Sequence, residues 1–167
     1  MALINQNNKM TYSPVGFAPT TFTKEEWQTK IMQAEDVLLN IEGHCNGPDE
    51  ADIAGIGTLK HYFVKDAYVR EITMEAGAIF TSQIHKYEHP FFVMEGDCDV
   101  LTEDGVANIK APYWGITKPE TKRLLFINEK TVWVTVHATD KTNIKDVNKD
   151  IMYQSFKQLK TIKGKIG

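Results

Sequence analysis

Short runs of β-branched and aromatic residues, separated by turn residues, fill positions 61–140 and constrain the fold more than any other feature. They predict strands at 68–74, 79–85, 91–95, 99–102, 106–109, 124–128 and 132–138. Turn-forming triplets lie between them, including Glu75-Ala76-Gly77, Glu95-Gly96-Asp97 and Asn128-Glu129-Lys130. The pattern is typical of an antiparallel sandwich or barrel built mainly from hairpins.

One helix is predicted before this region. Thr23 and Glu26 form a capping box, and Phe22 and Trp27 occupy the positions of a hydrophobic staple. Apolar residues then recur at three- and four-residue spacing as far as position 41, and Gly43 is placed to end the helix. Residues 43–57 are predicted to be a loop. The polar stretch 141–150 is predicted to lead into a short helix and a lysine-rich tail.

The 167 residues fit one domain in three parts. These are an arm with a helix packing on the barrel (1–60), the barrel (61–140), and a C-terminal helix with a basic tail (141–167). Because arms on a small barrel often bridge neighbouring subunits, we expect a homo-oligomer.

Charge and composition exclude several classes of partner. A net charge of −3 argues against binding of nucleic acid by the whole protein. No apolar run is long enough for a membrane span, and residues 1–10 lack the apolar region of a signal peptide. The spacing of Cys45 and Cys98 predicts buried thiols in a reducing compartment. We therefore expect a cytoplasmic protein without membrane partners.

The densest group of potential metal ligands is the segment Gln83-Ile84-His85-Lys86-Tyr87-Glu88-His89-Pro90. Its His85-x-x-Glu88-His89 pattern matches an inverted zinc-protease motif, but that motif requires a helix, which the β-prone residues before it and Pro90 after it disfavour. On strands, Gln83 and His85 share one face, and His89 re-enters on the next strand. Two imidazoles and an amide oxygen can then converge as a partial shell for a divalent metal.

The same segment resembles the first motif of the cupin superfamily. That motif runs Gly, five residues, His, one residue, His, three residues, Glu, six residues, Gly, and its spacing is matched by Gly77, Gln83, His85, His89 and Gly96. The Pro, Gly, His and Asn positions of the second motif are occupied by Pro119, Thr121, Leu124 and Asn128. The resemblance covers roughly residues 61–138. It implies an all-β, cupin-like (jelly-roll) barrel with an N-terminal helix and a short C-terminal helix.

The resemblance also bears on a metal, although only one of the four usual cupin ligands, His85, is retained in kind. Gln83 and Leu124 stand where the cupin motifs have histidines, and His89 stands where they have Glu. Leucine cannot ligate, so His137, in the strand row of Trp133 and Thr135, is the candidate for the missing ligand. The sequence leaves two alternatives open. Either His85, His89 and His137 hold one divalent transition metal (Zn, Fe, Ni or Mn), or they line a pocket without a metal that is empty or takes an organic ligand.

Four residues are candidates for binding a small-molecule ligand: Gln83, Arg70, Tyr113 and Arg123. Arg70 can hold an anion through a charge-assisted hydrogen bond or form a surface salt bridge. Arg123, with Lys122, can meet an anion at the barrel mouth or lie in a solvated turn. Tyr113 and Trp114 can form an aromatic lip on the pocket or a protein contact. No catalytic residue is assigned.

Several segments, among them 68–72, 101–105 and 131–140, resemble small cupin-like proteins encoded by tailed phages. This resemblance implies a phage protein, in the cytoplasm of the infected host cell or associated with the virion, with other phage proteins as partners. Three functions stay open. They are a non-enzymatic structural or accessory virion component or small-ligand binder, a metal-dependent enzyme of dioxygenase, isomerase or epimerase type, and a module that sequesters a nucleotide or other anionic small molecule. Whether the chain is an enzyme is also open.

Overall fold

The structure of the chain is a computed structural model, which describes residues 3–4, 10–11, 22–38, 44–45, 57–103, 105–153 and 155–166. Its elements, in chain order, are β1 (Leu3–Ile4), β2 (Met10–Thr11), α1 (Lys24–Leu38), β3 (His44–Cys45), β4 (Gly57–Val64), β5 (Ala67–Met74), β6 (Ile79–Thr81), β7 (Ile84–His85), β8 (His89–Thr102), β9 (Gly105–Lys110), β10 (Tyr113–Thr117), β11 (Leu124–Ala138), α3 (Ile144–Ile151), β12 (Met152–Tyr153) and α4 (Phe156–Ile166).

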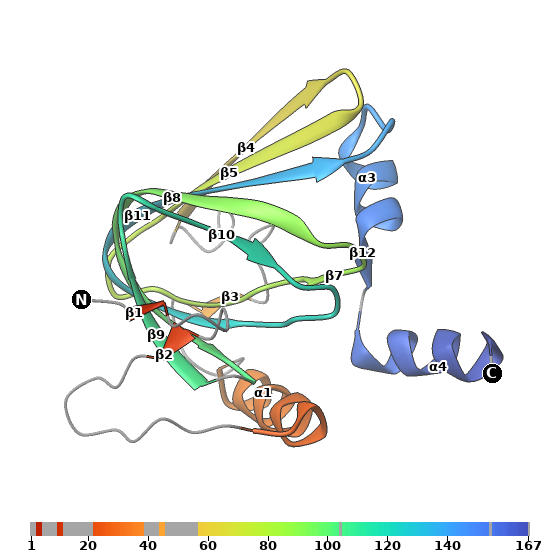
Figure 1. Ribbon diagram of the computed structural model, residues 1–167, viewed down its shortest axis with the longest axis horizontal. Coiled ribbons are helices and arrows are strands. Elements are labelled where there is room, and N and C mark those ends of the chain that lie inside the picture. Colours follow the sequence, from red (N-terminus) through yellow and green to blue (C-terminus); the bar gives the residue numbers. More distant parts are fainter. Residues whose placement is uncertain are drawn as a thin grey trace.

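Two long strands, β8 and β11, organise the sheet. They pair antiparallel with each other, and the two halves of each strand have different outer neighbours. The first half of β8 pairs with β10 and its second half with β9. The first half of β11 pairs with β6, and its second half pairs with β5, which pairs in turn with β4. Figure 1 shows these strands wrapping around a common interior.

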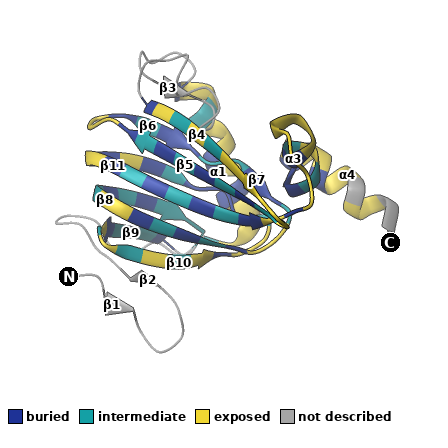
Figure 2. Cartoon of the chain, turned by 90° about the horizontal axis from the view of Figure 1, so that it is seen from above, coloured by how far each residue is buried: buried dark blue, intermediate teal, exposed yellow. Residues whose placement is uncertain are grey.

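Side chains from one face of this sheet fill the interior of the barrel. Buried residues alternate with more exposed ones along β5 and the second half of β11, as expected for strands with one face toward a core (Figure 2). The main cluster draws on both halves of the long strands and includes Phe91, Val100, Ile127 and Trp133. The predicted fold class, all-β with an N-terminal and a C-terminal helix, is confirmed.

Helix α1 begins as the sequence predicts. The Thr23 amide donates to Glu26 Oε2 (2.9 Å) and the Glu26 amide to Thr23 Oγ1 (3.2 Å), which completes the capping box. The Phe22 and Trp27 rings stack with centroids 6.2 Å apart. Trp27 is buried, and its indole Nε1 donates to the Lys122 carbonyl (2.9 Å), so the helix is fixed to the segment that enters β11. The predicted helix end at Gly43 lies outside the described residues.

The structure corrects several predicted elements. Two expected turns, at 95–97 and 128–130, are instead irregularities within the continuous strands β8 and β11. The strand expected at 79–85 is broken into β6 and β7, because residues 82 and 83 leave the ladder. Tyr113 and Trp114, for which no strand was predicted, lie on strand β10. The segment predicted as a loop at 43–57 contains β3, which pairs parallel with β6.

The C-terminal part is more structured than predicted. Instead of a short helix and a tail, it contains α3, the short strand β12 and α4. Strand β12 pairs with β7, with Met152 opposite His85. Figure 1 shows α3 and β12 at the end of the barrel that β11 reaches. None of the described helices is long and apolar enough to cross a membrane.

The arm predicted at residues 1–21 lies almost entirely outside the described residues, apart from the antiparallel pair β1 and β2. Cys98 is a buried free thiol, and burial raises its pKa to about 12. This agrees with the inert thiol predicted for that position.

Candidate metal centre

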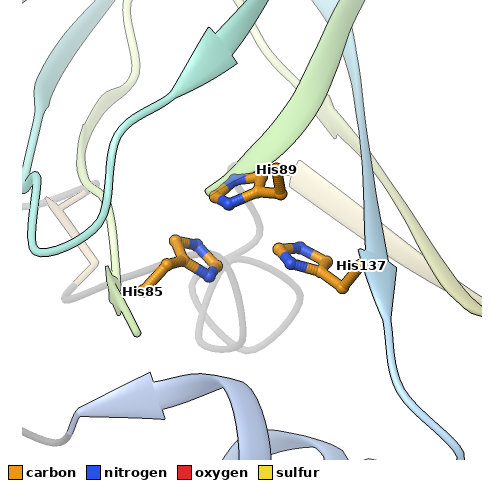
Figure 3. A group of neighbouring side chains, drawn as sticks. All are labelled: His85, His89 and His137. Carbon is orange, nitrogen blue, oxygen red and sulfur yellow. The ribbon is translucent and has the colours of Figure 1, made fainter. Parts of the chain in front are cut away.

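Three histidines from three different strands meet at one end of the barrel. His85 ends β7, His89 begins β8, and His137 lies next to the end of β11. All three are buried, with at most 4% of each residue exposed. Ring centroids are 4.2 Å apart for His85 and His89, 4.2 Å for His89 and His137, and 4.8 Å for His85 and His137. Their potential ligand atoms all lie within 4.8 Å of one another, and in Figure 3 the rings surround a common centre.

Strand alternation explains why His89 and His137 meet. Thr135 on β11 lies opposite Phe91 on β8, and both point into the barrel. Because the strands are antiparallel, the next inward positions toward this end of the barrel are His137, two residues after Thr135, and His89, two residues before Phe91. His85 reaches the same point from β7, which is held in place by its pairing with β12.

In each ring at least one nitrogen is not used in the hydrogen bonds described for these histidines. His89 Nδ1 lies 3.3 Å from the Tyr87 carbonyl, which can only accept, so this nitrogen carries the proton and Nε2 keeps its lone pair. His137 Nε2 forms a hydrogen bond with the Thr135 hydroxyl (3.1 Å), which leaves Nδ1 as the nitrogen that could bind a metal. His85 Nδ1 is buried and has no hydrogen-bond partner. A buried polar atom in that state is costly, and a metal ion would satisfy it.

Burial also keeps the three rings neutral. Desolvation lowers the pKa of His89 to about 4 and that of His137 to about 2, and it lowers the pKa of His85 well below its usual value. The positive charges of Arg70 and Arg123 lower the pKa of His85 and His89 further. Neutral imidazole is the form that binds metals, so the site holds ligands in the required state at pH 7.

The donor set fits a divalent transition metal. Imidazole nitrogens suit Zn, Fe and Ni, and bond lengths of about 2.0–2.1 Å place neighbouring nitrogens about 3.0–3.4 Å apart around such an ion. One nitrogen from each ring of this cluster lies within 4.8 Å of the others, which is close to that spacing. Three protein ligands also leave positions for another ligand, as open metal sites require.

A cavity of about 50 Å³ adjoins the histidines. A water molecule needs about 10–15 Å³ measured in this way, so the cavity takes a small ligand of a few water-sized groups. Its lining includes His85 and His89 together with two predicted ligand-binding residues, Arg70 and Arg123. The other two predicted residues, Gln83 and Tyr113, are not part of that lining. Tyr113 packs against the core instead, with its ring centroid 5.9 Å from that of Phe91.

A supporting layer behind His137 was not predicted. The Tyr68 ring stacks on His137 (centroids 6.0 Å apart), and its hydroxyl is 2.5 Å from His61 Nδ1. Tyr68 in turn packs against Val147, Ile151 and Met152 from the C-terminal elements. The sequence feature that could have indicated this role is that Tyr68 lies two residues before Arg70, on the same face of the strand.

The fold and the site define a class of protein: an antiparallel β-barrel with a buried three-histidine cluster beside a cavity that contains arginine. No protein-family model matches the chain, and no curated protein is detectably similar to it in sequence.

Similar solved structures cover about half of the chain. They include an RmlC-like cupin from Shewanella frigidimarina (14% identity, 50% of this chain and 77% of that one, TM-score 0.44). Another is KdgF from a Halomonas species (13% identity, 55% of this chain and 85% of that one, TM-score 0.46). A third is an acetylacetone dioxygenase from Acinetobacter johnsonii (16% identity, 49% of this chain and 59% of that one, TM-score 0.41). Similarities this weak do not identify a ligand or a reaction for this chain.

Proposed function

We propose that this chain is a cupin-like metal-binding protein that uses one divalent transition metal, held by His85, His89 and His137, to bind a small ligand inside the barrel. The observation that supports this most directly is the convergence of three buried, neutral histidines from β7, β8 and β11, with their ring nitrogens within 4.8 Å of one another. An unpartnered buried nitrogen on His85 points to the same conclusion.

A divalent metal bound there would supply Lewis acidity toward an oxygen donor of the ligand. The chain supplies the rest. Thr135 and the Tyr87 carbonyl orient two of the rings, and Phe80, Leu125 and Trp133 give the cavity apolar walls that limit access of water. None of the described residues lining the cavity is an Asp, Glu or Lys that could serve as a general acid or base. We therefore propose ligand binding at a metal, and the dioxygenase, isomerase or epimerase reactions stay predictions.

Metal titration tests the proposal. Protein stripped of metal and titrated with Zn²⁺, Mn²⁺, Ni²⁺ or anaerobic Fe²⁺ should bind about one equivalent of at least one of these ions. His137→Leu should weaken that binding by more than about 100-fold, because loss of even an outer-shell partner costs 10–100-fold. Glu88→Gln is the matched control. Glu88 is exposed, and it belongs to the protease pattern that the strands rule out, so its loss should leave metal affinity unchanged.

Binding of less than about a tenth of an equivalent of every ion by folded wild-type protein would overturn the proposal. Equal affinities of His137→Leu and wild type would do the same, since the ion would then sit elsewhere.

The phage setting, the virion or host-cell location and the homo-oligomer stay predictions. The resemblance of segments 68–72, 101–105 and 131–140 to small tailed-phage proteins supports the phage setting. The accessory role in the virion is a separate prediction, which is motivated by the loss of two usual cupin ligands, Gln83 and Leu124 standing in their places. Mass spectrometry of purified virions tests it, and absence of the protein from the particles would exclude a structural role in them.

A further inference from the structure

Two arginines are buried inside the barrel beside the histidines. Arg70, on β5, lies opposite Thr135 of β11, one inward-facing position away from His137. Arg123 comes immediately before β11 and is also buried. Both line the cavity that His85 and His89 line. Burying a guanidinium group removes its hydration, so two such groups in one small cavity call for an explanation.

Arg123 is held in place by the barrel wall. Its Nη2 donates to Thr117 Oγ1 (2.8 Å), and its guanidinium carbon lies 4.9 Å from the Phe91 ring centroid and 5.8 Å from that of Trp133. The hydroxyl and the two rings fix the orientation of the group but use few of its five N–H donors. Burial lowers the pKa of Arg123 to about 10, so the charge persists at pH 7.

Among the described residues that line the cavity, the charges are unbalanced toward the positive. Three neutral histidines leave both charges of a divalent ion uncompensated, and Arg70 and Arg123 add to them. None of the described residues that line the cavity is acidic. Glu103 acts on Arg123 through its charge, but it does not line the cavity, and its Oε2 has no hydrogen-bond partner.

We propose that the cavity binds a small dianion, with one carboxylate on the metal and a second anionic group on the guanidinium groups of Arg70 and Arg123. This inference rests on the proposed function and names the class of ligand that the site takes. The cavity volume of about 50 Å³ restricts the ligand to a short molecule, such as a dicarboxylate of three or four carbons. Planar guanidinium forks match carboxylate oxygens in pairs, which gives selectivity against neutral molecules of the same shape.

Malonate and its monoamide, malonamate, are the probes, because both offer one carboxylate to the metal and only malonate has a second anionic group for the arginines. Calorimetric titration of metal-loaded protein, with metal content measured before and after, should show malonate binding at least about 10-fold more tightly than malonamate. Arg123→Met should weaken malonate binding by about 10- to 100-fold at unchanged metal stoichiometry. Lys157→Met removes the same charge from the exposed face of α4 and should change neither quantity.

The outcomes separate this inference from the proposed function. One equivalent of metal without preference for malonate over malonamate would overturn the inference and leave the metal site standing. The same holds if folded Arg123→Met binds malonate as tightly as wild type. Because the malonamate comparison uses wild-type protein and keeps the carboxylate on the metal, it decides the question even if Arg123→Met does not fold. Absence of metal binding would overturn both proposals, since the dianion is placed across the ion and the arginines.

Discussion

Burial is what makes His85, His89 and His137 suitable ligands. In water each ring would be partly protonated near pH 6.5, but desolvation inside the barrel disfavours the charged form. The same burial leaves three polar rings within contact of one another, and His85 Nδ1 has no hydrogen-bond partner. The cluster therefore costs stability in the apoprotein, and a bound ion would recover it.

The apoprotein should accordingly lose stability in mild acid. In the unfolded chain a histidine takes up a proton below about pH 6.5, whereas folded His89 does so only near pH 4. Between these values the unfolded state binds more protons, so the free energy of unfolding falls as the pH falls, by up to about 1.4 kcal/mol per pH unit for each buried histidine. Urea denaturation of metal-free protein at pH 7.5, 6.0 and 5.0 measures the slope. His89→Gln should reduce it, and equal slopes in the two proteins would contradict this account.

At the scale of single residues, strand alternation and motif spacing predicted that His85, His89 and His137 lie close together, and the structure brings their rings together. Arg70 and Arg123 were predicted separately as anion-binding candidates, and both line the cavity. Gln83 was expected beside His85 because a regular strand would put both on one face. The break between β6 and β7 removes that regularity, and Gln83 does not line the cavity. Such a break depends on pairing with distant segments, which one sequence does not display.

The bends of β8 and β11 show how a correct local signal can receive the wrong interpretation. Gly96 and the triplet 128–130 are typical of turns, yet the structure has continuous strands there with shifts in register. A glycine in a strand can mark either a turn or a bulge, and only the partner strand decides between them. Here the bends let each long strand serve both halves of the barrel.

Gly96→Ala should therefore destabilise the protein strongly. Gly96 has φ of +87°, and an added Cβ would overlap the Lys130 carbonyl oxygen and lie 2.5 Å from Thr131 Oγ1. The left-handed backbone alone costs about 1–2 kcal/mol, and the overlap with backbone atoms adds to it, so we expect a loss of more than about 2 kcal/mol. Gly77→Ala is the matched control, because Gly77 has φ of +83° with nothing within 4 Å of its added Cβ. Urea denaturation compares the two, and equal losses would show that the contact with β11 is unimportant.

Across the whole molecule, the C-terminal elements close the end of the barrel that holds the histidines. Met152 pairs with His85, and the Lys86 amide donates to the Ile151 carbonyl (2.8 Å). Helix α3 packs Val147 and Ile151 against Tyr68, which stacks on His137. The sequence predicted a polar stretch, one short helix and a tail here. It did not predict the packing on the barrel, because the apolar residues are few and their partners lie more than 60 residues away. The segment therefore supports the histidine cluster.

Ile151→Ala should consequently affect both stability and metal binding. Ile151 is 2% exposed, and truncating a buried isoleucine typically costs about 2–5 kcal/mol. The truncated side chain would leave a void beneath Tyr68 and beside β12. The rings of His137 and His85 should then be held less firmly in their orientations, and metal affinity should fall by about 10-fold. Ile144→Ala is the control on the same helix: Ile144 is 40% exposed, so its loss should change stability by less than about 0.5 kcal/mol. Thermal denaturation and metal titration of both variants test the coupling. If Ile151→Ala lost stability but kept wild-type metal affinity, the C-terminal elements would stabilise the barrel without positioning its histidines.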